Sequence, residues 1–133
     1  MGTGLLLLAF SLRSAIACEC VLPSPKAEAK RAEIVFRGVI AEITDAQIVF
    51  SVQRVFKGQV SERFSMYKLV LDGDCVDGFR RGLVKVGNEL LVYAWRASYF
   101  TEGFLTSTCS RTALTENASL DLKQLGSGHG PSQ

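Results

Sequence analysis

Apolar residues recur along the middle of the chain with the two-residue period of a half-buried β-strand. The clearest example is residues 48–56, where Ile48, Phe50 and Val52 occupy every second position and therefore share one face of a strand. Other runs rich in β-branched and apolar residues predict further strands at residues 34–43, 63–71, 89–95 and 104–107. The pattern therefore predicts a mainly β domain of five strands.

Both ends of this β-rich region are predicted to be helical. Ser24 can cap a short helix with Pro25 at its first position and strong helix formers as far as Glu33. Near the other end, Gly126 is a natural stop for a second helix, which would also contain the Asn117 glycosylation sequon. The apolar residues near one face of that helix are Leu114, Ala118, Leu122 and Leu125. Residues 126–133 are predicted to form a disordered tail.

The length of 133 residues limits the chain to one compact domain. Five strands with a helix near each end fit a small, strongly curved antiparallel barrel, for example of the OB type. They also fit a small β-sandwich, because periodicity alone does not separate the two architectures.

Composition disfavours several functional classes. Hydrophobic residues make up 47% of the chain, too many for a disordered protein. The formal net charge of +2 reflects 15 basic and 13 acidic side chains, which gives no electrostatic case for binding nucleic acid or an anionic membrane. The single histidine, His129, lies in the polar tail, and no nucleophile–base pair or metal cluster is visible. We therefore expect a protein that is not an enzyme.

The N-terminal residues resemble a secretory signal. Residues 4–10 form an apolar run too short to span a bilayer, and Ala15-Ile16-Ala17 matches a signal-peptidase site. We expect residues 1–17 to be removed and the mature protein to begin at Cys18 in the extracellular space. The alternative for the apolar run is a buried N-terminal strand or helix.

A bacterial lipoprotein would also begin at a cysteine, in the periplasm or on the outer membrane. Such a signal normally carries Leu at the position of Ala15, and lipidation of Cys18 would leave an odd number of cysteines. We therefore expect an unlipidated Cys18 and no attachment to a membrane.

Four cysteines permit more than one disulfide pattern. Cys18 and Cys20 are too close in sequence to bridge each other without strain, so each is expected to pair with Cys75 or Cys109. The structural interpretation is that such bridges staple a small secreted domain, and a Cys-x-Cys redox pair is disfavoured. The functional alternative is that the α-amino group and carbonyl oxygen of Cys18 form a chelate for the open position of a catalytic zinc.

The mature N-terminus, Cys18-Glu-Cys-Val-Leu-Pro-Ser-Pro25, resembles the opening of the tissue inhibitors of metalloproteinases (TIMPs). The similarity extends over residues 18–125. Four further segments match in order, and they are Arg54-Val-Phe-Lys-Gly58, Asp74-Cys75, Glu89-Leu-Leu-Val-Tyr93 and Leu105-Thr-Ser-Thr-Cys-Ser110.

This resemblance implies a five-stranded OB-like antiparallel barrel of the netrin-like (NTR) type over residues 18–125. It implies the disulfides Cys18–Cys75 and Cys20–Cys109. It further implies a secreted, monomeric inhibitor of metzincin-like zinc metalloendopeptidases that has no cofactor of its own, because the zinc belongs to the target protease.

The resemblance also implies which residues contact the protease. The Cys18 amine and carbonyl would bind the zinc, and the side chain of Glu19 would enter the adjoining specificity pocket. The next residues would run along the cleft like substrate, and the loop before Cys75 would form a neighbouring ridge. The implied inhibitory residues are Cys18, Glu19, Cys20, Val21, Leu22, Gly73 and Asp74.

The sequence departs from the family at several points. Glu19 stands where the inhibitors usually carry Thr or Ser, and burying a carboxylate in an apolar pocket costs free energy. A third early cysteine and the separate C-terminal disulfide domain have no counterpart in the sequence. The alternative function is a non-inhibitory netrin-type module that binds another extracellular protein.

Two other features have a structural interpretation beside a functional one. Asp72, Asp74 and Asp77 resemble a calcium loop in composition, but their spacing is not that of an EF-hand and a solvated acidic loop is expected. Tyr93, Trp95 and Tyr99 are expected in the core or at a barrel rim, and the functional alternative is a platform on which ligands stack.

Overall fold

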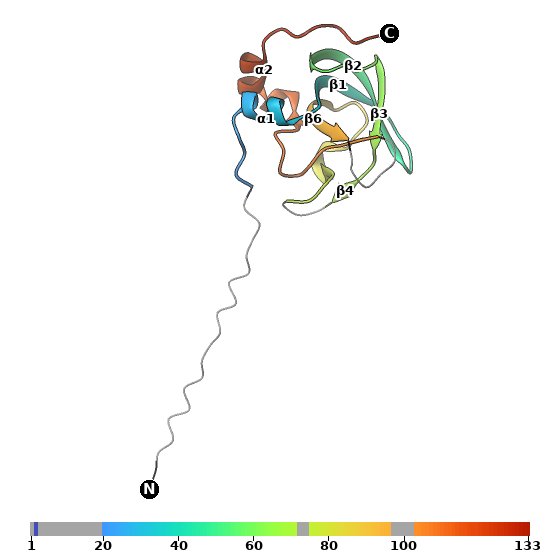
Figure 1. Cartoon of the computed structure of the whole chain (residues 1–133). Coiled ribbons are helices and arrows are strands. Elements are labelled where there is room, and N and C mark those ends of the chain that lie inside the picture. The colour runs from blue at the N-terminus through green and yellow to red at the C-terminus, as the bar shows by residue number, and fades with distance from the viewer. Residues whose placement is uncertain (1, 3–19, 72–74, 97–102) are drawn as a thin grey trace.

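The computed structural model describes residue 2 and residues 20–71, 75–96 and 103–133. It confirms a mainly β chain, built on an antiparallel sheet of six strands with two short helices packed beside it (Figure 1). The strands are β1 (Ile34–Ile43), β2 (Gln47–Lys57), β3 (Arg63–Tyr67), β4 (Val70–Leu71), β5 (Phe79–Arg80), β6 (Glu89–Arg96), β7 (Phe104–Leu105) and β8 (Ala113–Leu114). The helices are α1 (Pro25–Arg31) and α2 (Ser119–Leu125), and the 3₁₀ turns are η1 (Arg81–Leu83) and η2 (Thr115–Asn117).

The long strand β1 organises the sheet. It pairs with β2 on one edge and with β6 on the other, giving the order β3-β2-β1-β6-β7, while β8 also pairs with β6 and β4 pairs with β5. The β1–β2 register shifts between Arg37 and Gly38. A β-carbon on Gly38 would lie 3.0 Å from the carbonyl oxygen of Ser51, so the glycine lets the two strands approach closely where β1 bends.

The main core lies on one face of this sheet and is rich in aromatic residues. Phe36 of β1 packs edge-on against Phe50 of β2, with ring centroids 5.2 Å apart, and against Phe64 of β3 at 5.4 Å. Phe64 also lies 5.4 Å from the ring of Phe104 in β7. The two strands at opposite ends of the sheet order, β3 and β7, are therefore in contact through their side chains.

Helix α1 begins where the sequence predicts. The side chain of Ser24 accepts a hydrogen bond from the Ala27 amide, and Pro25 occupies the first turn. Both helices cover a second, smaller core on the other side of β1 and β6, and its buried members are Ala32, Val35, Leu91, Tyr93 and Ala118. Among the helices of the described residues, none has the length and apolarity needed to span a bilayer.

The C-terminal helix is shorter than predicted. Leu114 belongs to β8, where it pairs with Leu90, and exposed Asn117 ends η2 before α2 begins at Ser119. The helical spacing of Leu114 and Ala118 was misleading, because Leu114 pairs with β6 in the sheet and the 3₁₀ turn η2 separates it from α2. The stop at Gly126 is confirmed, with φ at +83°.

Residues 126–133 differ from the expected disordered tail. They run from α2 to β2 (Figure 1), where Val55 and His129 exchange backbone hydrogen bonds of 2.8 Å in both directions. The Arg54 guanidinium donates to the carbonyl oxygens of Ser127 and Gly128. Since β3 pairs only with residues 47–51 of β2, the backbone near Val55 is left open on this edge, and the tail supplies its partners.

The tail generates a prediction at Gly128. This glycine has φ +62°, and a β-carbon there would lie 2.5 Å from the Val55 carbonyl oxygen. Gly128→Ala should displace the tail and lower the free energy of unfolding by about 1–3 kcal/mol. Hydrogen exchange should show faster exchange of the Val55 amide, which donates to His129.

Gly130→Ala is the matched control, because a β-carbon there meets nothing within 4 Å. Equal exchange rates for the Val55 amide in the two variants would contradict the expected displacement.

Candidate functional site

The N-terminal segment, residues 20–23, leaves two apolar side chains exposed. Val21 is 90% exposed and Leu22 is 42% exposed, so neither side chain is part of the core. The segment has no helix or strand of its own, as expected before Pro23 and Pro25. Two adjacent apolar side chains held at the surface make this segment a candidate contact site.

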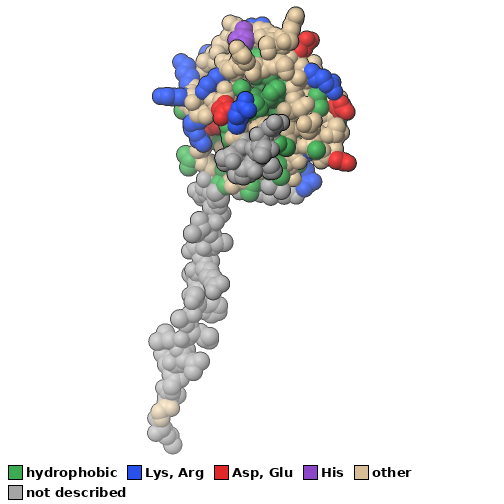
Figure 2. All heavy atoms as spheres, turned by 45° about the vertical axis from the view of Figure 1, so that its right-hand side comes forward, with side chains coloured by type: hydrophobic (Ala, Val, Ile, Leu, Met, Phe, Trp, Pro, Cys, Tyr) green, Lys and Arg blue, Asp and Glu red, His purple; other side chains and the backbone are tan. Residues whose placement is uncertain are grey.

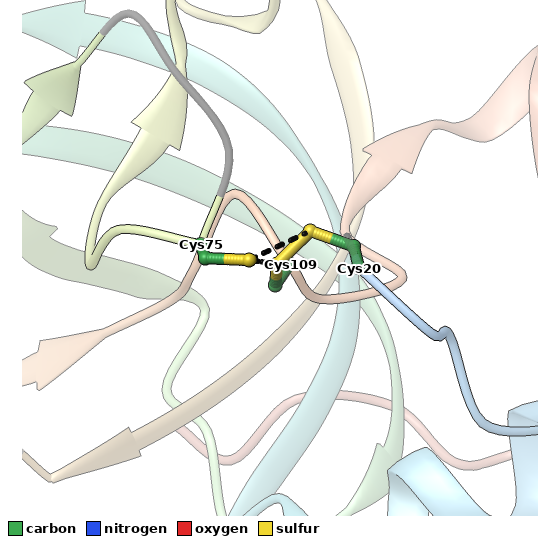
Figure 3. Close-up of side chains that lie close together, drawn as sticks. All are labelled: Cys20, Cys75 and Cys109. Carbon is green, nitrogen blue, oxygen red and sulfur yellow. Dashed lines mark hydrogen bonds between the residues drawn. A yellow bond between two sulfur atoms is a disulfide. The ribbon is translucent and has the colours of Figure 1, made fainter. Parts of the chain in front are cut away.

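A disulfide holds the first residue of this segment. Cys20 is bonded to Cys109, with 5.2 Å between their Cα atoms (Figure 3). This confirms one of the two bridges that the resemblance implies. The Sγ atom of Cys75 lies 2.9 Å from that of Cys109 and 3.6 Å from that of Cys20. The segment is therefore attached beside the loop that follows residue 74.

The three sulfur atoms do not form a metal site. Cys20, Cys75 and Cys109 lie within 4.8 Å of one another, but all three are disulfide-bonded and so offer no thiolate ligand. Cys18, the implied partner of Cys75, lies outside the described residues. Within the described part of the chain, no other group of three metal-ligating side chains comes together.

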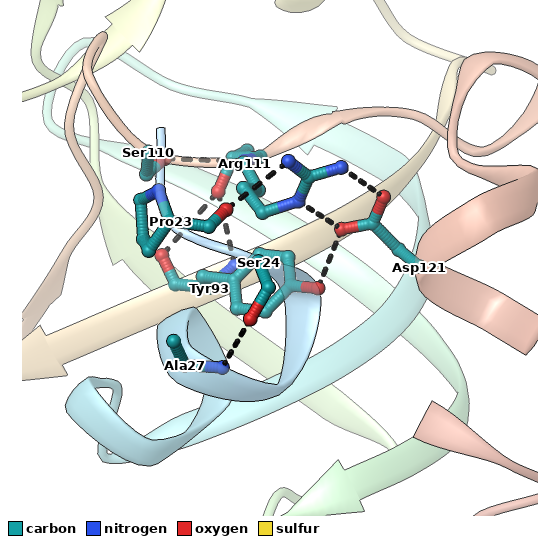
Figure 4. Close-up of polar contacts among 8 residues, drawn as sticks. Pro23, Ser24, Ala27, Tyr93, Ser110, Arg111 and Asp121 are labelled. Carbon is teal, nitrogen blue, oxygen red and sulfur yellow. Dashed lines mark hydrogen bonds and ion pairs between the residues drawn. The ribbon is translucent and has the colours of Figure 1, made fainter. Parts of the chain in front are cut away.

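A buried ion pair holds the other end of the segment. Arg111 donates from Nη1 to the carbonyl oxygen of Pro23 at 3.3 Å, and from Nε and Nη2 to the two carboxylate oxygens of Asp121 at 2.7 and 2.8 Å (Figure 4). Asp121 also accepts a 2.7 Å hydrogen bond from the Tyr93 hydroxyl. The pair thus joins α2 and β6 to the residue just before the α1 cap.

The environment keeps this pair ionised. Burial alone would raise the pKa of Asp121, but hydrogen bonds from Arg111 and Tyr93 outweigh it and hold that pKa below its ordinary value. The same contact raises the pKa of Arg111. Burial and the neighbouring carboxylate raise the pKa of Tyr93, so its hydroxyl remains a donor.

Glu28 of α1 lies close to this ion pair. Its side chain is 1% exposed, and its Oε2 atom has no hydrogen-bond partner. Burial raises the pKa of Glu28, and the nearby charges of Arg31 and Arg111 offset this only in part. Glu28 is therefore a buried group whose ionisation costs folding free energy.

The loop that carries both attachments is fixed by buried hydroxyl groups. Thr106 donates to the Tyr93 carbonyl oxygen at 2.7 Å and also bonds the hydroxyls of Ser110 and Thr112. The Thr108 amide donates to the carbonyl oxygen of Val76 at 2.9 Å. These contacts tie residues 106–112 to β6 and to the chain that follows Cys75.

The structure places only part of the sequence-predicted site. It brings Cys20, Val21 and Leu22 to one surface beside Cys75, whereas Cys18, Glu19, Gly73 and Asp74 lie outside the described residues, as do residues 1 and 3–17 of the expected signal. In the expected acidic loop, Asp72 and Asp74 also lie outside the described residues. Asp77 is described and forms an isolated backbone bridge with Ser107.

Sequence reasoning missed the buried polar groups near the segment. No sequence motif contained Arg111, Asp121 or Glu28. The sequence indicated Tyr93 as a core or rim residue, without its contact to Asp121. The available signal was weak, namely an acidic residue placed next to the apolar positions of the second predicted helix.

On the visible face of the domain, basic and acidic side chains are interspersed (Figure 2).

Glu28 generates a prediction about stability and pH. Because its pKa is raised from the ordinary value of 4.5, the stability it contributes is complete below that pH and is lost as the pH rises through the raised value. Glu28→Gln cannot ionise, so the free energy of unfolding of this variant relative to wild type should increase from about pH 4 to about pH 7. Chemical denaturation at several pH values measures this difference.

Glu116→Gln is the control, since it removes one negative charge from an exposed side chain. A stability difference for Glu28→Gln that changes with pH no more than that of the control would contradict the account of Glu28.

Comparison with known proteins does not assign this site. The chain matches no protein-family model, no curated protein and no solved structure. The functional interpretation therefore depends on the residues and contacts described above.

Proposed function

We propose that this chain is a secreted, TIMP-like inhibitor of zinc metalloendopeptidases. The N-terminal segment enters the cleft of the protease, and the α-amino group and carbonyl oxygen of Cys18 bind the catalytic zinc of that protease. The observation that carries the proposal is the segment itself, since Cys20 and Pro23 are each attached to the domain while Val21 and Leu22 stay exposed between them.

Two features of the fold support this proposal. The Cys20–Cys109 bridge is a pairing that the resemblance to TIMPs implies. The contact between Phe64 of β3 and Phe104 of β7 joins the two ends of the sheet order, which is consistent with closure into an OB-like barrel of the netrin type.

The proposed chemistry uses main-chain groups. An α-amino group titrates near pH 8, so a substantial fraction is neutral at physiological pH, and zinc stabilises that neutral form. The amine nitrogen and carbonyl oxygen of one residue complete a five-membered chelate around the metal. The chain needs no metal of its own and catalyses no reaction, because it occupies the ligand position that the water of a zinc protease would take.

The residues after Cys18 provide the remaining contacts in this proposal. Val21 and Leu22 lie along the cleft as an extended peptide does, through backbone hydrogen bonds and exposed side chains. Gly73 and Asp74, which precede Cys75, form the adjoining ridge. The Cys18–Cys75 bridge holds the chelating residue beside that ridge.

A second candidate function is a netrin-type module that binds another extracellular protein without contacting a metal. Glu19 favours this alternative, because a carboxylate is costly to place in an apolar specificity pocket. The exposed Val21 and Leu22 suit either function.

Extension of the N-terminus tests the chelate. The mature protein beginning at Cys18, verified by intact mass, is compared with a form carrying one additional N-terminal alanine. The extension converts the amine into an amide, so inhibition of a panel of metzincin proteases should weaken by about 100-fold or more, equivalent to about 2.8 kcal/mol.

An alanine added after Gln133 is the control and should leave the inhibition constant unchanged. Equal inhibition by the N-terminally extended form would rule out zinc binding by Cys18.

Replacement of Glu19 separates the two candidate functions. If the segment enters an apolar pocket, Glu19→Thr removes the cost of burying a carboxylate and should tighten inhibition by about tenfold or more. Glu116→Thr removes an exposed glutamate elsewhere and is the control. An unchanged inhibition constant for Glu19→Thr would instead favour the non-inhibitory binding module.

A further inference from the structure

We infer that Arg111 is a positioning residue for the N-terminal segment: its guanidinium, held by Asp121, binds the Pro23 carbonyl and so sets the direction in which residues 20–23 cross the surface. The effect of this contact on protease inhibition rests on the function proposed above, whereas the positioning of the segment by Arg111 is independent of that function.

Within the described residues, two attachments hold the segment, and both come from one loop. Cys109 binds Cys20 covalently, and Arg111, two residues later, binds Pro23. A single disulfide leaves a peptide free to rotate about the bonds of the bridge. A second contact three residues further along removes that freedom, so Val21 and Leu22 are fixed in direction as well as in place.

The chemistry of arginine suits this role. Its planar guanidinium presents donors on two sides, so Nε and Nη2 bind the Asp121 carboxylate while Nη1 reaches the Pro23 carbonyl. Asp121 is only 3% exposed and is itself held by the Tyr93 hydroxyl. The guanidinium is therefore fixed before it meets Pro23, and a lysine cannot make the same set of contacts.

Helix α1 does not supply this constraint. Its cap residue is Ser24 and its first residue is Pro25, so the hydrogen bonds of the helix act from Ser24 onward. The contact from Arg111 falls on Pro23, on the side of the cap that faces the exposed residues. Removing it should release Val21 and Leu22 while leaving the Ser24 cap intact.

The test compares Arg111→Lys with Arg63→Lys. The first keeps the positive charge beside Asp121 but loses the forked geometry, whereas the second makes the same change in an exposed ion pair with Glu42 of β1, away from the Arg111–Pro23 contact. Amide ¹⁵N relaxation at Val21 and Leu22 reports the order of the segment, and the inhibition constant for a metzincin protease reports its consequence.

We expect the order parameters of both amides to fall from about 0.85 to below about 0.6 in Arg111→Lys. Inhibition by this variant should weaken by about tenfold. Both quantities should stay near wild-type values in Arg63→Lys. Should Arg111→Lys fail to fold, Asp121→Asn, which keeps an oxygen for the guanidinium but removes the charge, should give a smaller change in the same direction.

Unchanged order at Val21 and Leu22 in Arg111→Lys would overturn the inference, as would an equal loss of order in Arg63→Lys. Lower order with an unchanged inhibition constant would overturn the role of this contact in inhibition. If the wild-type protein inhibits none of the proteases, the proposed function fails, and the relaxation comparison still decides whether Arg111 positions the segment.

Discussion

The N-terminal segment depends on a loop whose position is set by buried hydroxyl groups. Thr106 connects residues 106–112 to the backbone of β6 and to the hydroxyls of Ser110 and Thr112. Buried polar groups that satisfy one another in this way are rigid, because any movement would leave a donor or acceptor unpaired. The loop therefore transfers the rigidity of the sheet to Cys109 and Arg111.

This arrangement separates the parts of the molecule that provide stability from the segment that we propose for binding. The aromatic core around Phe36 and the small core beneath the helices stabilise the sheet, whereas the exposed segment adds little to either. A peptide that is ordered before it binds avoids the entropic cost that a free peptide pays on binding. In the proposed function, the segment can therefore be short and still bind tightly, provided that its attachments to Cys109 and Arg111 remain intact.

Local patterns predicted much of the fold and little of the site. The strands and the start of α1 follow from residues close in sequence, such as Ser24 and Pro25. The Cys20–Cys109 pairing came only from the resemblance, because spacing left the partners open. The Arg111–Pro23 contact joins residues 88 positions apart, and the register of Leu114 depends on Leu90, so neither has a local signal. The C-terminal segment pairs through its backbone, which side-chain composition does not reveal.

The pairing of that C-terminal segment also has a consequence for self-association. An uncovered strand edge offers unpaired amide and carbonyl groups to any other chain and is a common starting point for aggregation. Here the backbone of His129 and Ser132 occupies these groups beside Val55 and Val60. Residues 129–132 thus occupy the backbone groups at the end of β2, so a strand from a neighbouring molecule cannot pair there.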